Sequence, residues 1–359
     1  MHRGSDLLTP PPSTPLTQGS ADIKNGRGPA TALFINDAAP KPIPGPGEVL
    51  VRIKAFGLNR MDLMQREGNY PVPPQAPATL GVEFSGIVET LGSGAEGFAP
   101  GDPVFGLAYG GAYAQYISVS TATLLRKPDG LSWEQAAAIP ETWMTAAQAL
   151  HVVGEFGKEE EDREAAATKS VLWHAGASGV SIAGIQLSRR AGAGAVYATC
   201  GSDEKCAFVE RELGATRAFN YRTTEEGWDK AVLAATGGRG VHLIVDFVGA
   251  SYFARNLAVA ARDARWVALS FLGGRELPAG VDIAPFLYKR VRLEGSSLRS
   301  RDLRYQGALR DRLAGYLPDF ASGKLKIFID AVLPMEDIVK AHQLLEANTT
   351  KGKIICTVS

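Results

Sequence analysis

The pattern of hydrophobic and polar residues changes near residue 132. Before that point, apolar and polar residues alternate in short runs, as they do in half-buried strands. The clearest runs are 48–55, 81–88 and 112–119, and turns rich in Gly and Pro, such as 99–103, separate them. The first part of the chain therefore predicts a mainly β domain.

Beyond residue 132, short apolar runs alternate with helical segments, and Ser132 is placed to cap the first helix. This alternation predicts an α/β domain with a parallel, doubly wound sheet. Its six strand candidates are Val171–Ala175, Ala195–Cys200, Ala218–Tyr221, Val241–Phe247, Arg265–Leu272 and Val291–Ser296. Six is the number of strands in a complete Rossmann dinucleotide-binding fold. The chain ends in another strand candidate, 353–358, which is expected to join a sheet.

Two segments fit neither pattern. Residues 1–27 are rich in Ser, Thr, Pro and Gly and lack the apolar core of a secretory signal, so we expect a disordered tail. The charged run 158–164 is expected to be a solvated loop or an exposed helical insertion.

Composition narrows the class of protein. The 359 residues are enough for two hydrophobic cores, and 38 basic against 38 acidic residues give no electrostatic reason to expect nucleic acid or a membrane as partner. Three cysteines form no disulfide framework and cannot make a four-cysteine zinc site. No apolar run is long enough to span a bilayer. A cytoplasmic protein is the expectation.

A turn of small residues follows the first strand of the second part. Small residues let the backbone approach a pyrophosphate, and the N-terminus of the next helix offers free N–H groups. The turn consists of Gly176, Ala177, Ser178, Gly179 and Val180. Ser178 and Ser181 replace the second and third glycines of the GxGxxG fingerprint, so the motif by itself is weak. We interpret the turn as a cofactor site; the alternative is a turn needed only for packing.

The second strand of this part has no acid at its tip. It ends at Cys200, Gly201 and Ser202 come directly after it, and Lys205 follows closely. A carboxylate at this place usually binds the ribose of NAD, whereas a hydroxyl and an ammonium suit the 2′-phosphate of NADPH. Tyr221, at the end of the third strand, is expected nearby. The alternative for Lys205 is an ordinary exposed lysine.

Several segments, in order along the chain, resemble one known family. They are 58–70, 80–86, 139–146 and 174–180, and they are similar to the zinc-free, zeta-crystallin-like quinone oxidoreductases of the medium-chain dehydrogenase/reductase family. Residues 297–302 resemble in particular the branch of tumour-suppressor-inducible NADPH quinone oxidoreductases. The resemblance extends from about residue 28 to the C-terminus.

This resemblance implies an architecture. It places a GroES-like catalytic domain at residues 28–145 and 299–359, and a Rossmann domain that binds NADPH at residues 146–298. The active site would lie in the cleft between them, and a homodimer would form through the last Rossmann strand. In zinc-dependent relatives a Cys takes the place of Asn59 and a His that of Val82. An amide and a valine do not bind zinc there, although Asp62 and Glu83 remain.

The same resemblance assigns the catalytic candidates. Asn59, Asp62 and Tyr70 would line the substrate cleft, where Asn59 and Tyr70 could hydrogen-bond a carbonyl or quinone oxygen. Tyr70 could also donate a proton. Asp62 could instead cap its own short helix, and Tyr70 could instead pack against neighbouring prolines. Glu141 is expected to be structural or to set the polarity of the cleft, and His174 to be a satisfied buried histidine.

The remaining candidates would contact the cofactor. Thr145 would lie under the nicotinamide, unless its hydroxyl bonds the backbone of its own helix. The ends of the fourth and fifth strands would also line the crevice, and Lys353 would return near the adenosine phosphate. The strand-end residues are Val248, Gly249, Phe271, Leu272 and Gly273.

Three functions follow from these assignments. The leading hypothesis is hydride transfer from NADPH to a quinone without zinc. A close alternative is reduction of an activated C=C bond, and a third is a non-catalytic sensor that binds NADPH. Two departures from the family stand out. Ser181 is expected to weaken cofactor binding, and residues 21–26 offer only a remnant of the family's first strand.

Overall fold

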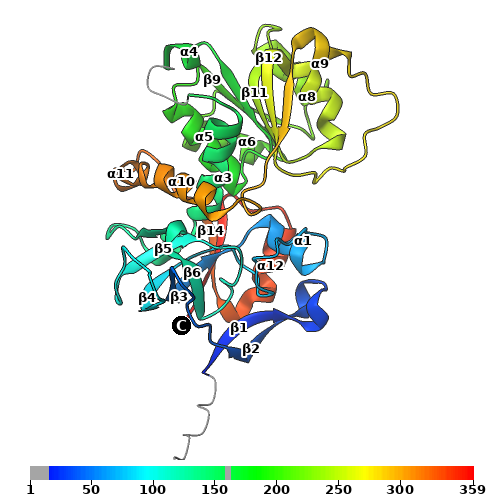
Figure 1. Cartoon of the computed structure of the whole chain (residues 1–359). Helices are drawn as coiled ribbons and strands as arrows, with labels where there is room; N and C mark the ends of the chain where they lie inside the picture. Colours follow the sequence, from blue (N-terminus) through cyan, green and yellow to red (C-terminus); the bar gives the residue numbers. More distant parts are fainter. Residues whose placement is uncertain (1–15, 158–162) are drawn as a thin grey trace, which may run out of the picture.

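The computed structural model describes residues 16–157 and 163–359. Figure 1 shows two stacked bodies, one built around a six-stranded sheet and the other around a seven-stranded sheet, with α10 and α11 lying at the level where they meet. The combination of a GroES-like domain and a Rossmann-type parallel sheet confirms the expected fold class. Within these residues, no helix combines the length and the apolar character needed to cross a membrane.

The seven-stranded sheet combines the first part of the chain with its end. Along β3, Val49, Val51 and Ile53 are buried while Arg52 is exposed, which is the alternation that the sequence showed. The terminal strand pairs antiparallel with β3, so the expected return of the chain to a sheet is confirmed. In sheet order the strands are β14 (Ile329–Pro334), β15 (Lys353–Thr357), β3 (Glu48–Gly57), β4 (Glu83–Leu91), β5 (Pro103–Leu107) and β7 (Leu124–Arg126), and β6 (Tyr116–Ser120) pairs with β3.

The N-terminal expectation was wrong for residues 17–27. β1 (Thr17–Ile23) pairs antiparallel with β2 (Leu33–Pro40), and η1 (Lys24–Gly26) follows it. Ala21 is buried, and its N–H donates to the carbonyl of Tyr113 at 2.7 Å. The strand is held by its partner strand and by this tertiary contact, which local composition does not reveal. Residues 1–15 lie outside the described part.

The six-stranded sheet is parallel throughout, and its order is that of two mononucleotide-binding halves. In sheet order the strands are β10 (Arg217–Asn220), β9 (Ala195–Cys200), β8 (Ser170–Trp173), β11 (Val241–Asp246), β12 (Ala260–Ala268) and β13 (Arg292–Gly295). All six expected strands are confirmed. β12 starts and ends earlier than expected, so residues 269–274 form a loop at its carboxyl end.

Helices cover both sheets and connect them. The expected cap of α2 is confirmed, because Ser132 Oγ accepts the N–H of Gln135 at 3.1 Å. α3 continues into a π-helical turn, η4 (Gln148–Val153), and packs against α5 and α10. The helices are α1 (Arg60–Arg66), α2 (Trp133–Ala137), α3 (Pro140–Ala147), α4 (Arg163–Ala167), α5 (Gly179–Arg190), α6 (Asp203–Leu213), α7 (Trp228–Ala235), α8 (Phe253–Val259), α9 (Ala284–Lys289), α10 (Leu303–Ala314), α11 (Leu317–Ala321) and α12 (Ile338–Glu346). Of the charged run 158–164, residues 158–162 lie outside the described part.

Candidate active site

The turn between β8 and α5 has the geometry of a phosphate loop. Ser178 caps α5, and its Oγ accepts the N–H of Ser181 at 3.5 Å. A Cβ on Gly176 would lie 2.9 Å from Ala198 Cβ, and one on Gly179 would lie 2.8 Å from Thr142 Cγ2. Both positions therefore require glycine. With the N-terminus of a twelve-residue helix behind it, the turn suits a pyrophosphate.

Ser181 does not disturb this turn. It is buried, and its Oγ donates to the carbonyl oxygen of His174 at 2.7 Å. The close contact between helix and strand occurs about one turn later, where a Cβ on Gly184 would lie 2.2 Å from Trp173 Cη2. Packing at Ser181 therefore gives no steric reason for the weak cofactor binding that the sequence suggested.

His174 is a satisfied buried histidine, as expected. Its Nδ1 lies 2.9 Å from Thr199 Oγ1, and its Nε2 lies 2.7 Å from Asn256 Oδ1. Burial lowers the pKa of its imidazole. Both ring nitrogens are engaged inside the Rossmann domain, so His174 supports the fold beneath the phosphate loop.

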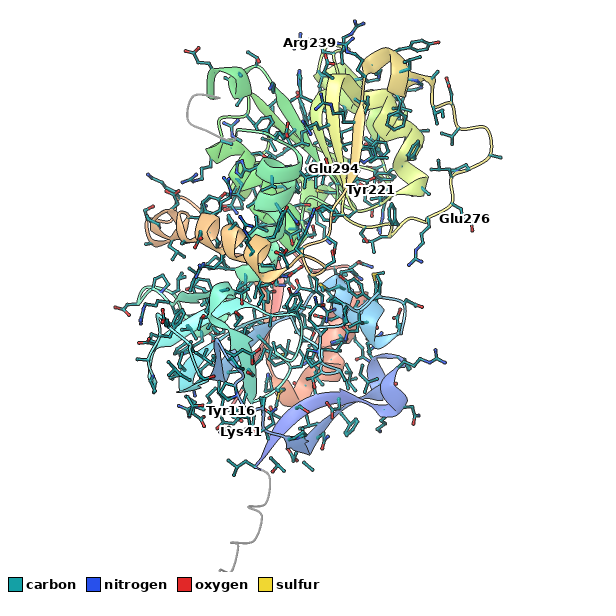
Figure 2. All side chains as sticks on the ribbon, in the orientation of Figure 1. Lys41, Tyr116, Tyr221, Arg239, Glu276 and Glu294 are labelled. Atoms are coloured by element: carbon teal, nitrogen blue, oxygen red, sulfur yellow. The ribbon has the colours of Figure 1, made fainter. Side chains whose placement is uncertain are left out.

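The residues expected at the 2′-phosphate come together. Ser202 caps α6, with its Oγ accepting the N–H of Lys205 at 3.2 Å. A Cβ on Gly201 would lie 2.8 Å from the hydroxyl of Tyr221, so these two strand ends are adjacent. Figure 2 shows Tyr221 in the body built around the six-stranded sheet. Lys205 is half-buried, and its Nζ donates to the carbonyl of Asn348 at 2.7 Å.

The two acids near this group are engaged elsewhere. Asp203 Oδ1 accepts the amide of Asn220 at 2.7 Å, and Glu204 forms an ion pair with Lys351 at 2.5 Å. Neither contact involves Lys205. The ammonium of Lys205 is thus available to an anionic ligand that displaces a single backbone hydrogen bond.

Arg222 belongs to the same group and was missed by the sequence reasoning. Its guanidinium lies 5.8 Å from the centre of the Tyr221 ring. Burial lowers the pKa of Lys205, and the charge of Arg222 lowers it further. The available signal was its position directly after Tyr221 at a strand end. Two cations and two hydroxyls therefore surround the place expected for a 2′-phosphate.

Two loops meet at the carboxyl ends of β11 and β12. The N–H groups of Val248 and Gly249 both donate to Asp246 Oδ1, at 2.7 and 3.2 Å. The N–H of Gly273 donates to the carbonyl of Val248 at 2.7 Å, and that of Leu272 donates to Phe247 at 3.0 Å. The side chains of Phe271 and Leu272 are exposed. These residues lie in loops and not in the strands, and the loops form one edge of the crevice.

A buried polar cluster lies on the GroES-like side. Lys353 Nζ lies 2.6 Å from Glu83 Oε1 and donates to Asn59 Oδ1 at 2.8 Å. Asn59 Nδ2 donates to Glu83 Oε1 at 2.9 Å. The stem of Lys353 lies against Gly179 of the phosphate loop, with its Cδ 3.1 Å from an added Cβ. The ammonium of Lys353 is thus held beside Asn59, which corrects its expected place near the adenosine phosphate.

Asp62 caps its own helix, which was one of its two interpretations. It is buried, and its Oδ2 accepts the N–H of Asn59 at 2.8 Å and the hydroxyl of Tyr113 at 3.0 Å. Burial raises its pKa to about 6, against the opposing effect of these hydrogen bonds. Its Oδ1 has no hydrogen-bond partner among residues 16–157 and 163–359. The capping role orients Asn59 at the entrance of α1.

Tyr70 lies against an arginine that the sequence reasoning did not single out. The guanidinium of Arg299 lies 5.4 Å from the centre of the Tyr70 ring. Arg299 is buried, and its Nε donates to the carbonyl of Tyr109 and its Nη1 to Gln65 Oε1, both at 2.7 Å. Burial raises the pKa of Tyr70, the charge of Glu141 raises it further, and Arg299 opposes both. The signal for Arg299 was its place in the motif 297–302.

Glu141 and Thr145 lie on α3, facing the same cluster. The N–H of Glu141 donates to Glu83 Oε2 at 2.9 Å. Burial, followed by the charge of Glu83, raises the pKa of Glu141 to about 8. Thr145 Oγ1 donates to Glu141 Oε1 at 3.4 Å, so its hydroxyl bonds a side chain and not its own helix backbone. The carboxyl of Glu141 therefore holds its proton to a higher pH than an ordinary glutamate does.

The donors around the cleft do not fit a zinc ion. Within the described ranges, no group of three His, Cys, Asp or Glu side chains is arranged to hold a metal. Glu83 accepts from Lys353, Asn59 and the N–H of Glu141, and Val82 supplies no donor atom. A cation at this place would compete with the ammonium of Lys353.

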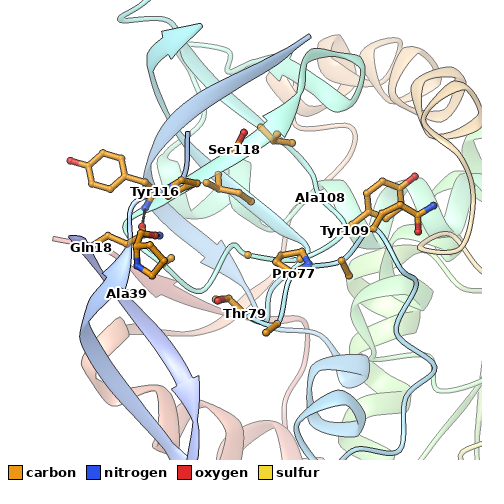
Figure 3. Close-up of a pocket in the computed structure, with 18 of the residues that line it drawn as sticks. Gln18, Ala39, Pro77, Thr79, Ala108, Tyr109, Tyr116 and Ser118 are labelled. Atoms are coloured by element: carbon orange, nitrogen blue, oxygen red, sulfur yellow. Dashed lines mark hydrogen bonds between the residues drawn. The ribbon is translucent and has the colours of Figure 1, made fainter. Parts of the chain in front are cut away.

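A large pocket lies apart from this cluster. It has a volume of about 970 Å³ and lies between the β1–β2 hairpin, β6 and the loop 75–79 (Figure 3). None of the predicted site residues lines it. Its lining includes Tyr109, whose carbonyl holds Arg299. We place the candidate active site at the ionisable cluster and the phosphate loop. A reaction needs ionisable and phosphate-binding groups, and the large pocket offers space without the predicted site residues.

Comparison with known proteins identifies the family. Residues 45–129 match the alcohol dehydrogenase GroES-like domain, and residues 179–313 match the zinc-binding dehydrogenase family. Human quinone oxidoreductase is 28% identical, over 91% of this chain and 94% of its own length. The crystal structure of an NAD-dependent alcohol dehydrogenase is 32% identical with a TM-score of 0.79, covering 95% of this chain and 100% of that one. A mycobacterial protein solved in complex with NADPH is 28% identical with a TM-score of 0.80, covering 95% and 99%.

The chain belongs to the medium-chain dehydrogenase/reductase family, and it is an oxidoreductase of that family. Of these solved structures, one is named as an NAD-dependent alcohol dehydrogenase and another was solved in complex with NADPH. These similarities support a nicotinamide cofactor for this chain, and the phosphate loop, the group around Lys205 and the loops at β11 and β12 are its candidate site.

Proposed function

We propose that the protein reduces quinones by hydride transfer from NADPH, without zinc. One observation carries the proposal: Tyr70 and Arg299 offer hydrogen-bond donors in the cleft, while the ammonium of Lys353 neutralises Glu83 where zinc-dependent relatives bind metal. Donors suit an oxygen that becomes negative as hydride arrives at the substrate. The similarity to human quinone oxidoreductase supports this substrate class.

The choice of NADPH rests on the group at the ends of β9 and β10. Ser202, Lys205, Tyr221 and Arg222 would hold the 2′-phosphate, because a dianion pairs with two cations and accepts from two hydroxyls. The turn at 176–180 would hold the pyrophosphate. The bound cofactor supplies the hydride from its nicotinamide ring.

The residues on both sides of the crevice would orient the nicotinamide. Thr145 would lie on one face, and the joined loops of β11 and β12 would close the other and exclude water. Tyr70 would donate to the substrate oxygen. Asn59 would contribute after exchanging its bond with Lys353 or Glu83.

The assay that tests the proposal follows nicotinamide absorbance after 9,10-phenanthrenequinone or 1,2-naphthoquinone is added. We expect oxidation with NADPH, much slower oxidation with NADH, and no effect of a chelator. Loss of activity with the chelator would overturn the zinc-free mechanism. Tight NADPH binding without oxidation by any acceptor would instead indicate a sensor.

Reduction of an activated C=C bond is the second candidate, and Tyr70 favours it. That reaction needs a proton at the α-carbon, and the hydroxyl of Tyr70, whose ring lies against Arg299, would be its donor. A quinol can take its protons from water. Tyr70→Phe should therefore reduce enone turnover by about 100-fold or more and quinone turnover much less. Equal losses with both substrates would exclude Tyr70 as the specific proton donor.

We also propose a homodimer formed through β13. This strand is at the edge of the six-stranded sheet, and all four of its residues are exposed. Leu287, Tyr288 and Leu293 are exposed next to it or on it. An open edge strand with apolar neighbours is a surface that proteins normally cover.

A further inference from the structure

Arg299 is a buried cation without a carboxylate partner among the described residues. Its exposed fraction is 3%, and its hydrogen bonds go to the Tyr109 carbonyl and to the amide oxygen of Gln65. Its Nη2 is buried and has no hydrogen-bond partner in the described ranges. Burying an unpaired charge is costly, so a structural role alone would not favour this arrangement.

Another buried arginine of the same chain shows the usual solution. Arg66 has an exposed fraction of 1%, and it lies 2.6 Å from Glu346 and 2.9 Å from Glu67. It also contacts His342 Nδ1 at 3.0 Å. The charge of Arg66 is therefore balanced by two carboxylates, and its role is structural. Arg299 is also held by two hydrogen bonds, but its Nη2 has no hydrogen-bond partner among the described residues.

The acids that feel the charge of Arg299 do not form an ion pair with it within the described residues. Glu83 is engaged by Lys353, and Asp62 is engaged as a helix cap. Glu141 has one buried carboxyl oxygen without a partner among the described residues, and it does not pair with Arg299. The group that lies against Arg299 is the ring of Tyr70.

We propose that Arg299 is a positioning residue that stabilises the negative charge on Tyr70 as this tyrosine gives its proton to the substrate. The inference rests on the second candidate function, reduction of an activated C=C bond, and deepens it. The hydride leaves the nicotinamide with both electrons and forms a bond to the substrate. The O–H bond of Tyr70 then breaks, its proton goes to the reduced substrate, and the tyrosinate later takes a proton from water.

The other groups facing Tyr70 fit this role. Burial and then the charge of Glu141 raise the pKa of Tyr70, whereas Arg299 and Ser297 lower it. Because burial and the charge of Glu83 raise the pKa of Glu141 to about 8, this carboxyl carries less negative charge near neutral pH than an ordinary glutamate and opposes Arg299 less. Gln65 on α1 and Tyr109 hold two of the guanidinium nitrogens, and the third, Nη2, has no hydrogen-bond partner among the described residues.

Kinetics of Arg299→Met, alone and combined with Tyr70→Phe, test the proposal. With an enone as the acceptor, we expect Arg299→Met to lower kcat by about 100- to 1000-fold with unchanged KM for NADPH, and Arg299→Lys to restore part of the loss. In the Tyr70→Phe background the same change should lower kcat by no more than about twofold.

Arg301→Met is the matched control. The guanidinium of Arg301 lies over the ring of Tyr305 and not over Tyr70, so this variant should behave as wild type. Equal losses in both backgrounds would overturn the proposal.

A second measurement does not depend on turnover. Absorbance titration of tyrosinate, with Tyr70→Phe as the reference, gives the pKa of Tyr70 directly. We expect Arg299→Met to move it upward, because a cation beside the phenolate is lost. If the wild type oxidises NADPH with neither quinone nor enone, the proposed function fails, and this titration alone decides on Arg299. An unchanged pKa of Tyr70 would then refute the link.

Discussion

At the scale of single residues, three buried acids of one cluster differ in their partners. Glu83 forms an ion pair with Lys353, and Asp62 accepts two hydrogen bonds as a helix cap. Glu141 has the weakest set of partners, and burial together with Glu83 raises its pKa to about 8. The same chemical group thus serves as an ion-pair partner, a helix cap and an acid with a raised pKa within one cluster, because its surroundings differ.

The raised pKa of Glu141 makes a stability prediction. The folded protein binds the proton more tightly than the unfolded chain, whose ordinary value is 4.5. This contribution is complete below pH 4.5 and is lost as the pH rises through about 8. Glu141→Gln has no carboxyl to ionise at this position and therefore does not lose this stability as the pH rises. The free energy of unfolding of the variant minus that of wild type should increase between pH 4.5 and about 8, by on the order of a few kcal/mol.

Denaturant unfolding at a series of pH values measures this difference. Glu134→Gln, on the neighbouring helix α2, is the control and should give a flat difference. A flat difference for Glu141→Gln as well would show that its carboxyl is ionised and solvated in the folded protein. The comparison with wild type cancels the titration of Asp62, since both proteins contain it.

Cofactor preference is a second prediction for single residues. Lys205→Met and Arg222→Met each remove a cation from the place proposed for the 2′-phosphate. Each should raise KM for NADPH by about 10- to 100-fold and leave KM for NADH nearly unchanged. Lys230→Met is the control, because that lysine is exposed and pairs only loosely with Glu226. Parallel losses with both cofactors would indicate a role in folding and not in recognition of the phosphate.

Local spacing explains which of these residues could be predicted. Ser202 caps α6 and Lys205 lies in the first turn of that helix. A strand that is followed directly by a helix is visible in the sequence, so the positions of these two residues could be predicted. Lys353 contacts Asn59 across 294 positions, and Arg299 contacts Gln65 across 234. No local pattern encodes such pairs. The family resemblance indicated the motifs that contain these residues, but it could not predict which of their atoms form hydrogen bonds.

At the scale of elements, the Rossmann strands were predictable from the pattern of apolar residues and from the length of each apolar run. Buried parallel strands form continuous apolar runs, and all six runs became strands. β1 was not predictable in the same way, because its residues are mostly small and polar and it depends on β2 and on Tyr113. Strand ends also shifted where a loop made the crevice, as at the carboxyl end of β12.

The junction of α5 with β8 supports a third prediction. Gly184, and not Ser181, is where helix and strand approach most closely, since an added Cβ would lie within 2.2 to 2.4 Å of three atoms of Trp173. Gly184→Ala should lower the free energy of unfolding by about 1–3 kcal/mol through overpacking. Chemical denaturation checks this. Gly130→Ala, where nothing lies within 4 Å, should be nearly neutral. A neutral Gly184→Ala would mean that the indole of Trp173 moves aside freely.

At the scale of the whole molecule, the site depends on the path of the chain. The chain leaves the seven-stranded sheet, builds the six-stranded sheet and returns through β14 and β15. Arg299 lies where it leaves the Rossmann domain, and Lys353 begins its last strand. The substrate side of the cleft is therefore completed only when the returning segment has docked against β3.

The proposed dimer makes the last prediction. If β13 pairs antiparallel with its copy about a twofold axis through Leu293, Arg292 of one copy lies opposite Glu294 of the other. Figure 2 labels Glu294 on this strand. Leu293→Asp would place two like charges against each other on the axis. Sedimentation velocity should therefore show a dimer for wild type and a monomer for Leu293→Asp. Val332→Asp, an exposed position on the edge strand β14, should remain dimeric. A monomeric wild type would contradict the proposed dimer. Dissociation by Val332→Asp but not by Leu293→Asp would place the dimer contact at β14 and not at β13.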